Sequence, residues 1–175
     1  MAIVGDKSIF AIEWEVTGAE AGYVFAKFCY WVADEQVGDY EDEVVLGAVV
    51  GITKHYLDLY DQRNINHLAE ATKEDIFDYV YESVMGRAKG KEIPRDQPRD
   101  WNLLGKQQSV FHLTNCGGAA FWDHVAIILI NDETRKKQRL IWKCRNEDLV
   151  NEVILDEKAF DLVASEFIAV AEKTL

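Results

Sequence analysis

The strongest hydrophobic pattern in the chain covers residues 23–32 (YVFAKFCYWV), where both sets of alternating positions are apolar apart from Lys27. Tyr, Val, Phe and Trp fit a pleated, half-buried surface better than a helix. A strand that is apolar on both faces is usually central in its sheet. The pattern therefore predicts a central strand that delivers an acidic stretch, residues 34–43, to the surface.

Other patterns of period two predict further strands. Residues 8–16 alternate apolar side chains with Glu13 and Glu15, which indicates a half-buried strand. The glycine-bearing residues 17–22 are short enough to join it to the central strand as a hairpin. A short strand is expected at Gln36 and Val37. Four more are expected near the C-terminus, with a hairpin loop at 131–137: residues 109–113, 124–130, 138–144 and 149–155.

Apolar residues that recur at steps of three and four predict three helices. The first covers residues 43–62, and its acidic start suits the positive end of a helix dipole. The second covers residues 72–85, with Thr72 as its N-cap and Gly86 at its end. The third begins after Asp156, the expected cap, and its buried stripe is Phe160, Val163, Phe167 and Val170.

Strands in hairpin order, with helices grouped between and after them, indicate an α+β fold. We expect a mostly antiparallel sheet of about six strands with three helices packed on it. A length of 175 residues is typical of a single domain, here residues 1–175. Residues 87–108 hold both prolines and lack clear periodicity, which is typical of a functional or mobile loop.

Charge changes this picture, because the chain has 19 Lys and Arg against 31 Asp and Glu, a net charge of −12. Residues 1–85 alone hold 5 cations and 17 anions, whereas residues 86–108 are net basic. An acidic surface repels phosphate backbones, so no nucleic-acid partner is expected. The same surface attracts basic proteins and speeds their encounter. The simpler explanation is solubility alone.

Targeting signals and cysteine usage indicate the cellular compartment. No apolar run approaches the roughly eighteen residues of a membrane span, and the N-terminus lacks the pattern of a signal peptide. Cys29, Cys116 and Cys144 are odd in number and widely spaced. Free thiols in a reducing cytoplasm explain them most simply, and no membrane partner is expected.

The sequence contains one candidate for enzymatic chemistry. Cys116 lies in a glycine-bearing turn, flanked by His112 and His124, and Asp123 could orient a histidine. A Cys/His hydrolase needs thiolate and imidazole within hydrogen-bond reach. The alternative is a loop cysteine with unrelated neighbours. No zinc-ligand spacing or phosphate-binding glycine motif occurs, so we expect neither a metal nor a cofactor.

Several motifs resemble the immunity protein 42 family, whose members occur beside polymorphic toxins in bacteria. The matching stretches are IFAIEWE at 9–15, FAKFCYW at 25–31, VGDYE at 37–41, LIW at 140–142, EVIL at 152–155 and FDLV at 160–163. The resemblance implies a non-enzymatic protein that binds and blocks a cognate toxin domain. A basic nuclease is one candidate toxin, since an acidic inhibitor can plug a basic cleft.

The acidic stretch is the expected partner-binding site. Charged groups at the rim of an interface mainly set the association rate, and a buried aromatic side chain mainly sets the dissociation rate. The candidate residues are Asp34, Glu35, Asp39, Tyr40, Glu41, Asp42 and Glu43. Two alternatives remain at this point, a hydrolase that uses Cys116 and an acidic adaptor for a basic protein.

Overall fold

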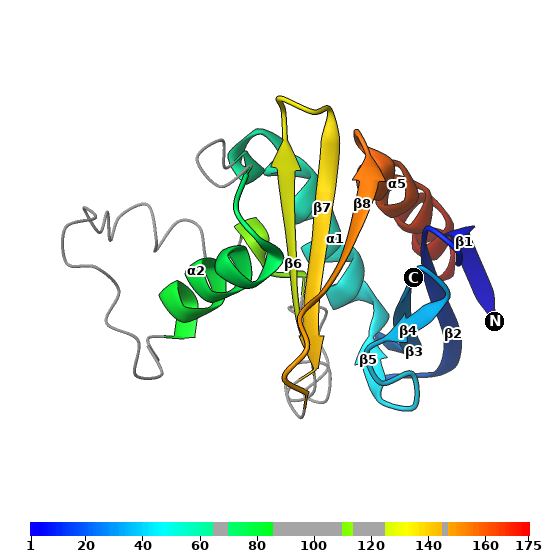
Figure 1. The fold of residues 1–175 in the computed structure, drawn as a ribbon. Helices are drawn as coiled ribbons and strands as arrows, with labels where there is room; N and C mark the ends of the chain where they lie inside the picture. The colour runs from blue at the N-terminus through cyan, green and yellow to red at the C-terminus, as the bar shows by residue number, and fades with distance from the viewer. Residues whose placement is uncertain (65–69, 86–109, 114–124, 145–146) are drawn as a thin grey trace.

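The computed structural model describes residues 1–64, 70–85, 110–113, 125–144 and 147–175, without the side chains of residues 81–85. The loop expected at 87–108, together with Gly86, Cys116, Asp123 and His124, lies outside the described residues. The described strands form two antiparallel sheets, and the described α-helices pack beside and between them (Figure 1). The predicted α+β class is confirmed. The described residues form eight strands in two sheets, where a single sheet of about six strands was expected.

The N-terminal sheet is built around β3, as the two-faced apolar pattern predicted. β2 pairs with one edge of β3, while β4 and β5 pair with different parts of its other edge. β1 extends the sheet beyond β2. The bounds are Ala2–Asp6 for β1, Phe10–Glu20 for β2, Tyr23–Val32 for β3, Glu35–Val37 for β4 and Glu43–Val45 for β5.

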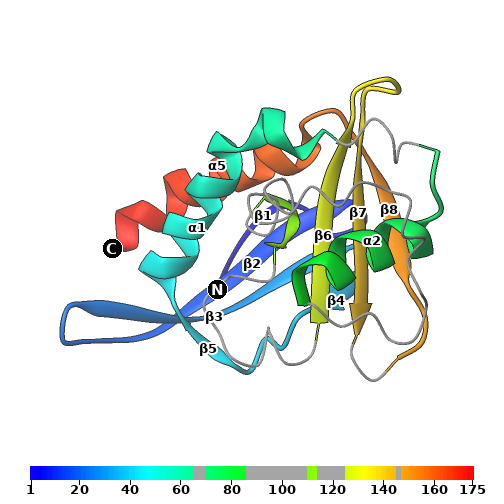
Figure 2. The same cartoon turned by 90° about the vertical axis from the view of Figure 1, so that its left-hand side faces the viewer.

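The β2–β3 hairpin is longer than predicted. Its strands continue past a bulge between Val16 and Gly18 to the pair Glu20 and Tyr23, so the turn is only Ala21 and Gly22. Both turn residues have positive φ, which suits a two-residue hairpin loop. Residues 17–23 are all exposed, and the hairpin projects beyond the rest of the sheet (Figure 2).

The C-terminal sheet contains β6 (Val125–Asp132), β7 (Lys137–Cys144) and β8 (Asn151–Asp156) in that order. The hairpin loop predicted between β6 and β7 is confirmed. The strand expected at 109–113 is wrong for the described part, where His112 makes one isolated bridge to Ile128. A single bridge does not form a strand ladder. The apolar periodicity of residues 109–113 therefore predicted a strand that the described part does not form.

The first helix, α1, covers Leu46–Asp58 and is followed by the 3-10 turn η1 at Tyr60–Arg63. Its predicted start at residue 43 is wrong, because Glu43–Val45 pairs with Phe25–Lys27 as β5. Tertiary pairing therefore overrides the helical periodicity at this end. As a result, α1 has no acidic residue in its first turn.

The other two α-helices lie close to their predicted positions. α2 covers Lys73–Met85, and the Asp75 amide donates to Thr72 Oγ1 at 3.1 Å, which confirms the N-cap. α5 covers Ala159–Ala171 and continues into the 3-10 turn η4, Glu172–Thr174. The predicted Asp156 cap of α5 is wrong, since Asp156 is the last residue of β8 and the N-cap position is Lys158.

Two hydrophobic clusters hold the sheets and helices together. The larger one joins the inner face of the N-terminal sheet, α1, α5 and one face of the C-terminal sheet; Phe28 and Phe167 lie at its centre. The smaller one joins the opposite face of the C-terminal sheet to α2. Both faces of the C-terminal sheet are thus covered, whereas the described helices pack on one face of the N-terminal sheet (Figures 1 and 2).

A buried polar network ties α5 to the C-terminal sheet. Arg63 is fully buried, pairs with Asp161 and lies near the rings of Tyr60 and Phe160. Gln138 donates to Asp161 Oδ2 at 2.6 Å and accepts a hydrogen bond from the Phe160 amide at 3.0 Å. Gln138 therefore satisfies a first-turn amide that would otherwise need a cap within α5.

Candidate functional site

The acidic residues 39–43, which we call the acidic segment, link β4 to β5 along one edge of β3. The Glu41 amide donates to Asp39 Oδ1 at 3.0 Å, and the Asp42 amide donates to the Asp39 carbonyl at 3.3 Å. These bonds form a local turn of the kind that aspartate favours. The turn presents exposed carboxylates from a link held at both ends by strand pairing.

Lys27 lies at the centre of this arrangement. Its ammonium is 2.5 Å from Glu41 Oε2 and 5.9 Å from the centroid of the Tyr40 ring. Glu15 and Glu43 are its direct neighbours on β2 and β5. The hydrogen bond to Glu41 raises the pKa of Lys27, and the negative charges of Glu41, Glu15 and Glu43 act in the same direction.

Tyr40 is the aromatic member of the acidic segment. Its side chain is half-buried, and burial is the main cause that raises its pKa to about 12. The hydroxyl group is inaccessible and has no hydrogen-bond partner in the structure. The phenol is therefore neutral, and its half-buried side chain leaves one buried polar atom unsatisfied.

A second polar cluster lies on the same sheet face and was missed from the sequence. Trp31 Nε1 donates to Glu13 Oε2 at 2.7 Å, and Lys7 Nζ approaches the same oxygen at 2.6 Å. The Lys7 ammonium also lies 3.9 Å from the centroid of the Trp31 ring. Alternation in residues 8–16 placed Glu13 on the polar face of its strand. The strand at residues 23–32 is apolar on both faces, so only the hairpin register brings Trp31 to Glu13.

The structure divides the predicted site residues into two groups. The acidic segment lies beside Lys27, whereas Asp34 and Glu35 lie at the far end of β3, where Glu35 pairs with Val32. Val32 is five residue steps along the strand from Lys27, which is roughly 17 Å. Asp34 adopts φ +66° in a tight turn and donates its amide to the Lys7 carbonyl.

The N-terminal sheet holds most of the excess negative charge. Residues 1–45 contain ten Asp and Glu but only two cationic side chains, Lys7 and Lys27. Both lysines already form ion pairs, with Glu13 and Glu41. The dipole of α1 does not explain the acidic segment, because the helix starts at Leu46 with no acid in its first turn. These carboxylates remain an accessible feature of the surface.

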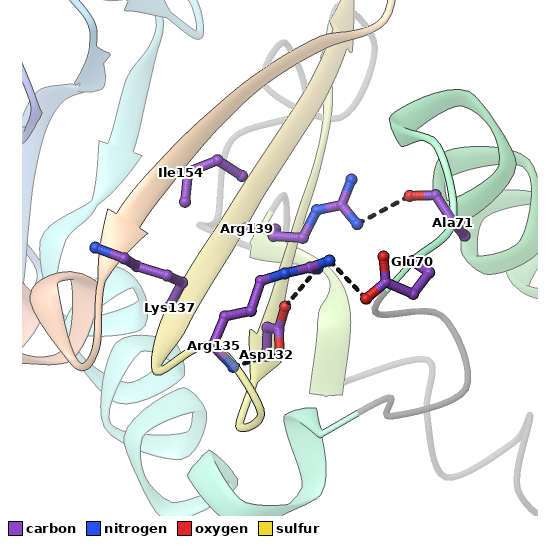
Figure 3. Close-up of a pocket in the computed structure, with 7 residues that line it drawn as sticks. All are labelled: Glu70, Ala71, Asp132, Arg135, Lys137, Arg139 and Ile154. Carbon is purple, nitrogen blue, oxygen red and sulfur yellow. Dashed lines mark hydrogen bonds and ion pairs between the residues drawn. The ribbon is translucent and has the colours of Figure 1, made fainter.

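A cavity of about 340 Å³ lies on the α2 side of the C-terminal sheet (Figure 3). It is lined by Glu70, Ala71, Asp132, Arg135, Lys137, Arg139 and Ile154. Arg135 bridges Glu70 and Asp132, at 2.6 and 3.0 Å. Lys137 pairs with Asp156.

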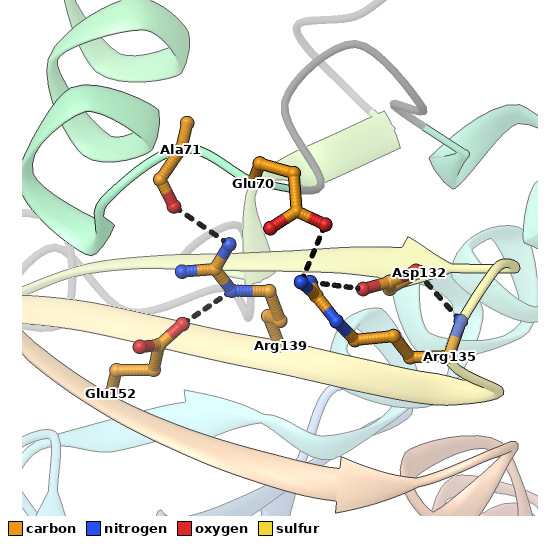
Figure 4. Close-up of polar contacts among 6 residues, drawn as sticks. All are labelled: Glu70, Ala71, Asp132, Arg135, Arg139 and Glu152. Carbon is orange, nitrogen blue, oxygen red and sulfur yellow. Dashed lines mark hydrogen bonds and ion pairs between the residues drawn. The ribbon is translucent and has the colours of Figure 1, made fainter.

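Arg139 connects this cavity to the start of α2 (Figure 4). Its Nε lies 2.5 Å from Glu152, and its Nη1 donates to the Ala71 carbonyl at 3.0 Å. Each cation of the cavity is therefore paired with a carboxylate of the same chain. These contacts are better explained as structural ion pairs that hold the β6–β7 hairpin to the start of α2 than as a binding site for an external anion.

The described histidine and cysteine side chains that could take part in catalysis lie in environments that disfavour it. His112 is 4% exposed, and burial lowers its pKa to about 4. Burial raises the pKa of the Cys29 thiol to about 12, and that of Cys144 also rises, which disfavours reactive thiolates. Over the described parts of the chain, no group of three or more potential ligands could hold a metal ion, and no helix could cross a membrane.

The α+β fold and its acidic sheet face fit the class of protein-binding domains. A comparison of the sequence with known protein families identifies the family: residues 1–170 match the immunity protein 42 family. The chain therefore belongs to the immunity protein 42 family, and it is an immunity protein with a cognate toxin as partner.

A solved structure shares the fold. It is the crystal structure of CdiI from Burkholderia dolosa, with a TM-score of 0.69 and 12% sequence identity over 96% of this chain and 99% of that one. Curated proteins gave no match to the sequence.

Proposed function

We propose that this immunity protein neutralises its toxin without catalysis, by forming a tight one-to-one complex through the acidic face of its N-terminal sheet. The proposed contacts are Asp34, Glu35, Asp39, Tyr40, Glu41, Asp42 and Glu43. The observation that carries the proposal is the ten carboxylates of residues 1–45 against two lysines, each already paired. A surface of this kind speeds the encounter with a basic protein.

The two groups of acids have different parts in this proposal. The acidic segment surrounds Tyr40, so it can combine an aromatic anchor with charged groups at the rim. Asp34 and Glu35, at the far end of β3, act at longer range by steering the partner. A basic nuclease is the toxin class that suits this surface best, since its substrate cleft must attract phosphate groups. The free thiols Cys29 and Cys144 are consistent with action in the cytoplasm.

Association kinetics with the toxin domain encoded beside this gene test the proposal directly. The variant Glu41→Lys, Asp42→Lys, Glu43→Lys should associate on the order of tenfold more slowly at low salt, with weaker salt dependence. The matched control reverses three exposed acids outside the N-terminal sheet, Glu147, Asp148 and Glu166. It should retain most of the rate, although its net charge changes equally.

Co-expression with the toxin gives the corresponding result in cells. The wild type and the control should protect, and the acidic-segment variant should protect less. The wild-type protein failing to bind or protect would refute the proposed function. Equal slowing of both triple variants would instead show that net charge acts without a local interface.

The absence of catalysis is tested separately. Cys116→Ala is expected to protect cells as well as the wild type. Rapid, saturable labelling of Cys116 by a thiol-directed activity probe, together with loss of protection in the variant, would favour the hydrolase alternative. The protein should also give no salt-sensitive gel shift with duplex DNA or RNA at physiological ionic strength.

A further inference from the structure

The outer face of β3 carries a row of large side chains that no described helix covers. Side chains alternate along a strand, and the even-numbered residues of β3 from Ala26 to Val32 belong to the larger core. The odd-numbered residues therefore point to the opposite face. We call the accessible ones the outer row: Tyr23, Phe25, Lys27 and Trp31. Cys29 lies between them but is fully buried.

The row begins on the projecting hairpin. Tyr23 is 58% exposed, and its cross-strand neighbour is Glu20; Phe25 lies opposite Gly18, which has no side chain to cover it. A two-stranded ribbon is only marginally stable by itself. An exposed arm that carries Tyr23, with the half-buried Phe25 at its base, is thus a costly feature unless another molecule covers it.

The row then runs into the acidic segment. Lys27 contacts Glu41 and lies over Tyr40, and Glu15 and Glu43 lie to either side of Lys27 on the neighbouring strands. At the far end Trp31 is half-buried beside Glu13. Lys27 and the carboxylates thus lie in the middle of the row, with Tyr40 beside them and aromatic side chains at both ends. Aromatic residues of this kind supply much of the binding energy in protein–protein hot spots.

We propose that the outer row, together with Tyr40, is the centre of the toxin interface, and that the hairpin arm reaches over the toxin with Tyr23 as an anchor. This inference rests on the proposed function and assigns most of its binding energy to the outer row and Tyr40 rather than to the carboxylates of the acidic segment. Carboxylates flank the row, so the occupant is a toxin surface in which apolar groups are bordered by Lys or Arg.

Charge also selects between this partner and a second copy of the chain. Two outer faces placed together would bring Glu15, Glu41 and Glu43 of one copy onto the same carboxylates of the other, with only the already paired Lys27 among them. Like-charged faces repel unless counterions are bound between them. A basic toxin has the complementary sign, so self-association is disfavoured relative to toxin binding.

The experiment measures binding kinetics of Tyr23→Ala and Tyr23→Lys with the adjacent toxin domain. Tyr23→Ala should dissociate about tenfold faster or more, as expected for an aromatic anchor. Tyr23→Lys should lose more affinity for the toxin, because it also adds a positive charge next to a basic partner. Leu162→Ala is the matched control, since Leu162 on α5 is 69% exposed and lies away from the row. Unchanged melting temperatures would exclude misfolding of the variants.

The outcomes separate this inference from the proposed function. If the wild type binds and the acidic-segment variant associates slowly, but Tyr23→Ala behaves like Leu162→Ala, the outer row is not the interface while the proposed function stands. If the wild type does not bind the toxin, both fail. Light scattering that shows a dimer, dissolved by Tyr23→Ala without loss of toxin binding, would assign the row to self-association instead.

Discussion

Lys27 and Glu41, fourteen residues apart in the sequence, form an ion pair of 2.5 Å that joins the middle of β3 to the link between β4 and β5. The pair neutralises one carboxylate of the acidic segment and holds the lysine over the Tyr40 ring. A toxin that offers a basic side chain to this face would meet Lys27 as an internal competitor for Glu41. The pair should therefore moderate toxin association more than it stabilises the fold.

Lys27→Met tests this role. The variant should associate with the toxin faster and with a steeper salt dependence, because Glu41 is released and the face becomes one unit more negative. Its melting temperature should change little, since Glu41 is 77% exposed and such pairs contribute little. The control is Lys54→Met, which removes the same charge from α1, where Lys54 pairs with Glu172. Slower association of Lys27→Met would mean that the Lys27 ammonium pairs with an acidic group of the toxin instead of competing with its basic side chains.

Tyr40 should matter for binding rather than for stability. Tyr40→Phe removes a hydroxyl with no partner, so the free energy of unfolding should stay unchanged or rise by up to about 1 kcal/mol. Tyr40→Ala should mainly speed toxin dissociation, costing on the order of 2 kcal/mol if the ring is an anchor. Denaturant titration and dissociation kinetics measure the two effects. A clear loss of stability in Tyr40→Phe would show that the hydroxyl is bonded in solution.

The Arg63–Asp161 pair should be important for stability. Asp161→Ala leaves a fully buried guanidinium without its carboxylate, which should cost about 3–5 kcal/mol in the free energy of unfolding. Asp156→Ala, which breaks an exposed pair with Lys137, should hardly change the melting temperature. The double variant Arg63→Met, Asp161→Leu should recover much of the loss. Failure of this apolar pair to do so would point to the Gln138 contacts as the larger contribution.

His112 should make stability depend on pH. Burial lowers its pKa to about 4 in the folded protein, below the ordinary value of 6.5. The unfolded chain then binds the proton first, so this contribution to stability is complete above pH 6.5 and is lost as the pH falls toward 4. At pH 5 the loss amounts to about 2 kcal/mol. Denaturant titrations at pH 7.5 and 5 should show this difference between the wild type and His112→Asn; equal pH dependence in both would contradict it.

The two-faced strand at the centre of the N-terminal sheet was predictable from the sequence. Alternation from Tyr23 to Val32 is a local property, because neighbouring side chains on a strand point to opposite faces. The α2 start at Thr72 and the buried side chains Phe160 and Phe167 of α5 were also predictable, since caps and helical periodicity act within a few residues. The match to the immunity protein 42 family agrees with the motifs in these regions.

Local patterns failed where pairing with a distant strand decided the outcome. Val44 fits a helix or a strand, and only the ladder between β5 and Phe25–Lys27 makes it a strand. The same ladder moves the start of α1 to Leu46 and so leaves the acidic segment outside the helix dipole. Gly18 resembles a loop residue, yet its pairing with Phe25 extends the hairpin arm.

By itself, the sequence determined most of the elements, the α+β class and the concentration of negative charge, because each depends on composition or on neighbours along the chain. Only the tertiary structure decided which charges meet. Hairpin register placed Glu15 beside Lys27 and Glu13 beside Trp31, while two short strands on one edge of β3 placed Glu41 next to Lys27 and Asp34 far from it. A shift of one residue in register would move every side chain of a strand to the opposite face of the sheet. Long-range strand pairing, rather than residue type, therefore determines this surface.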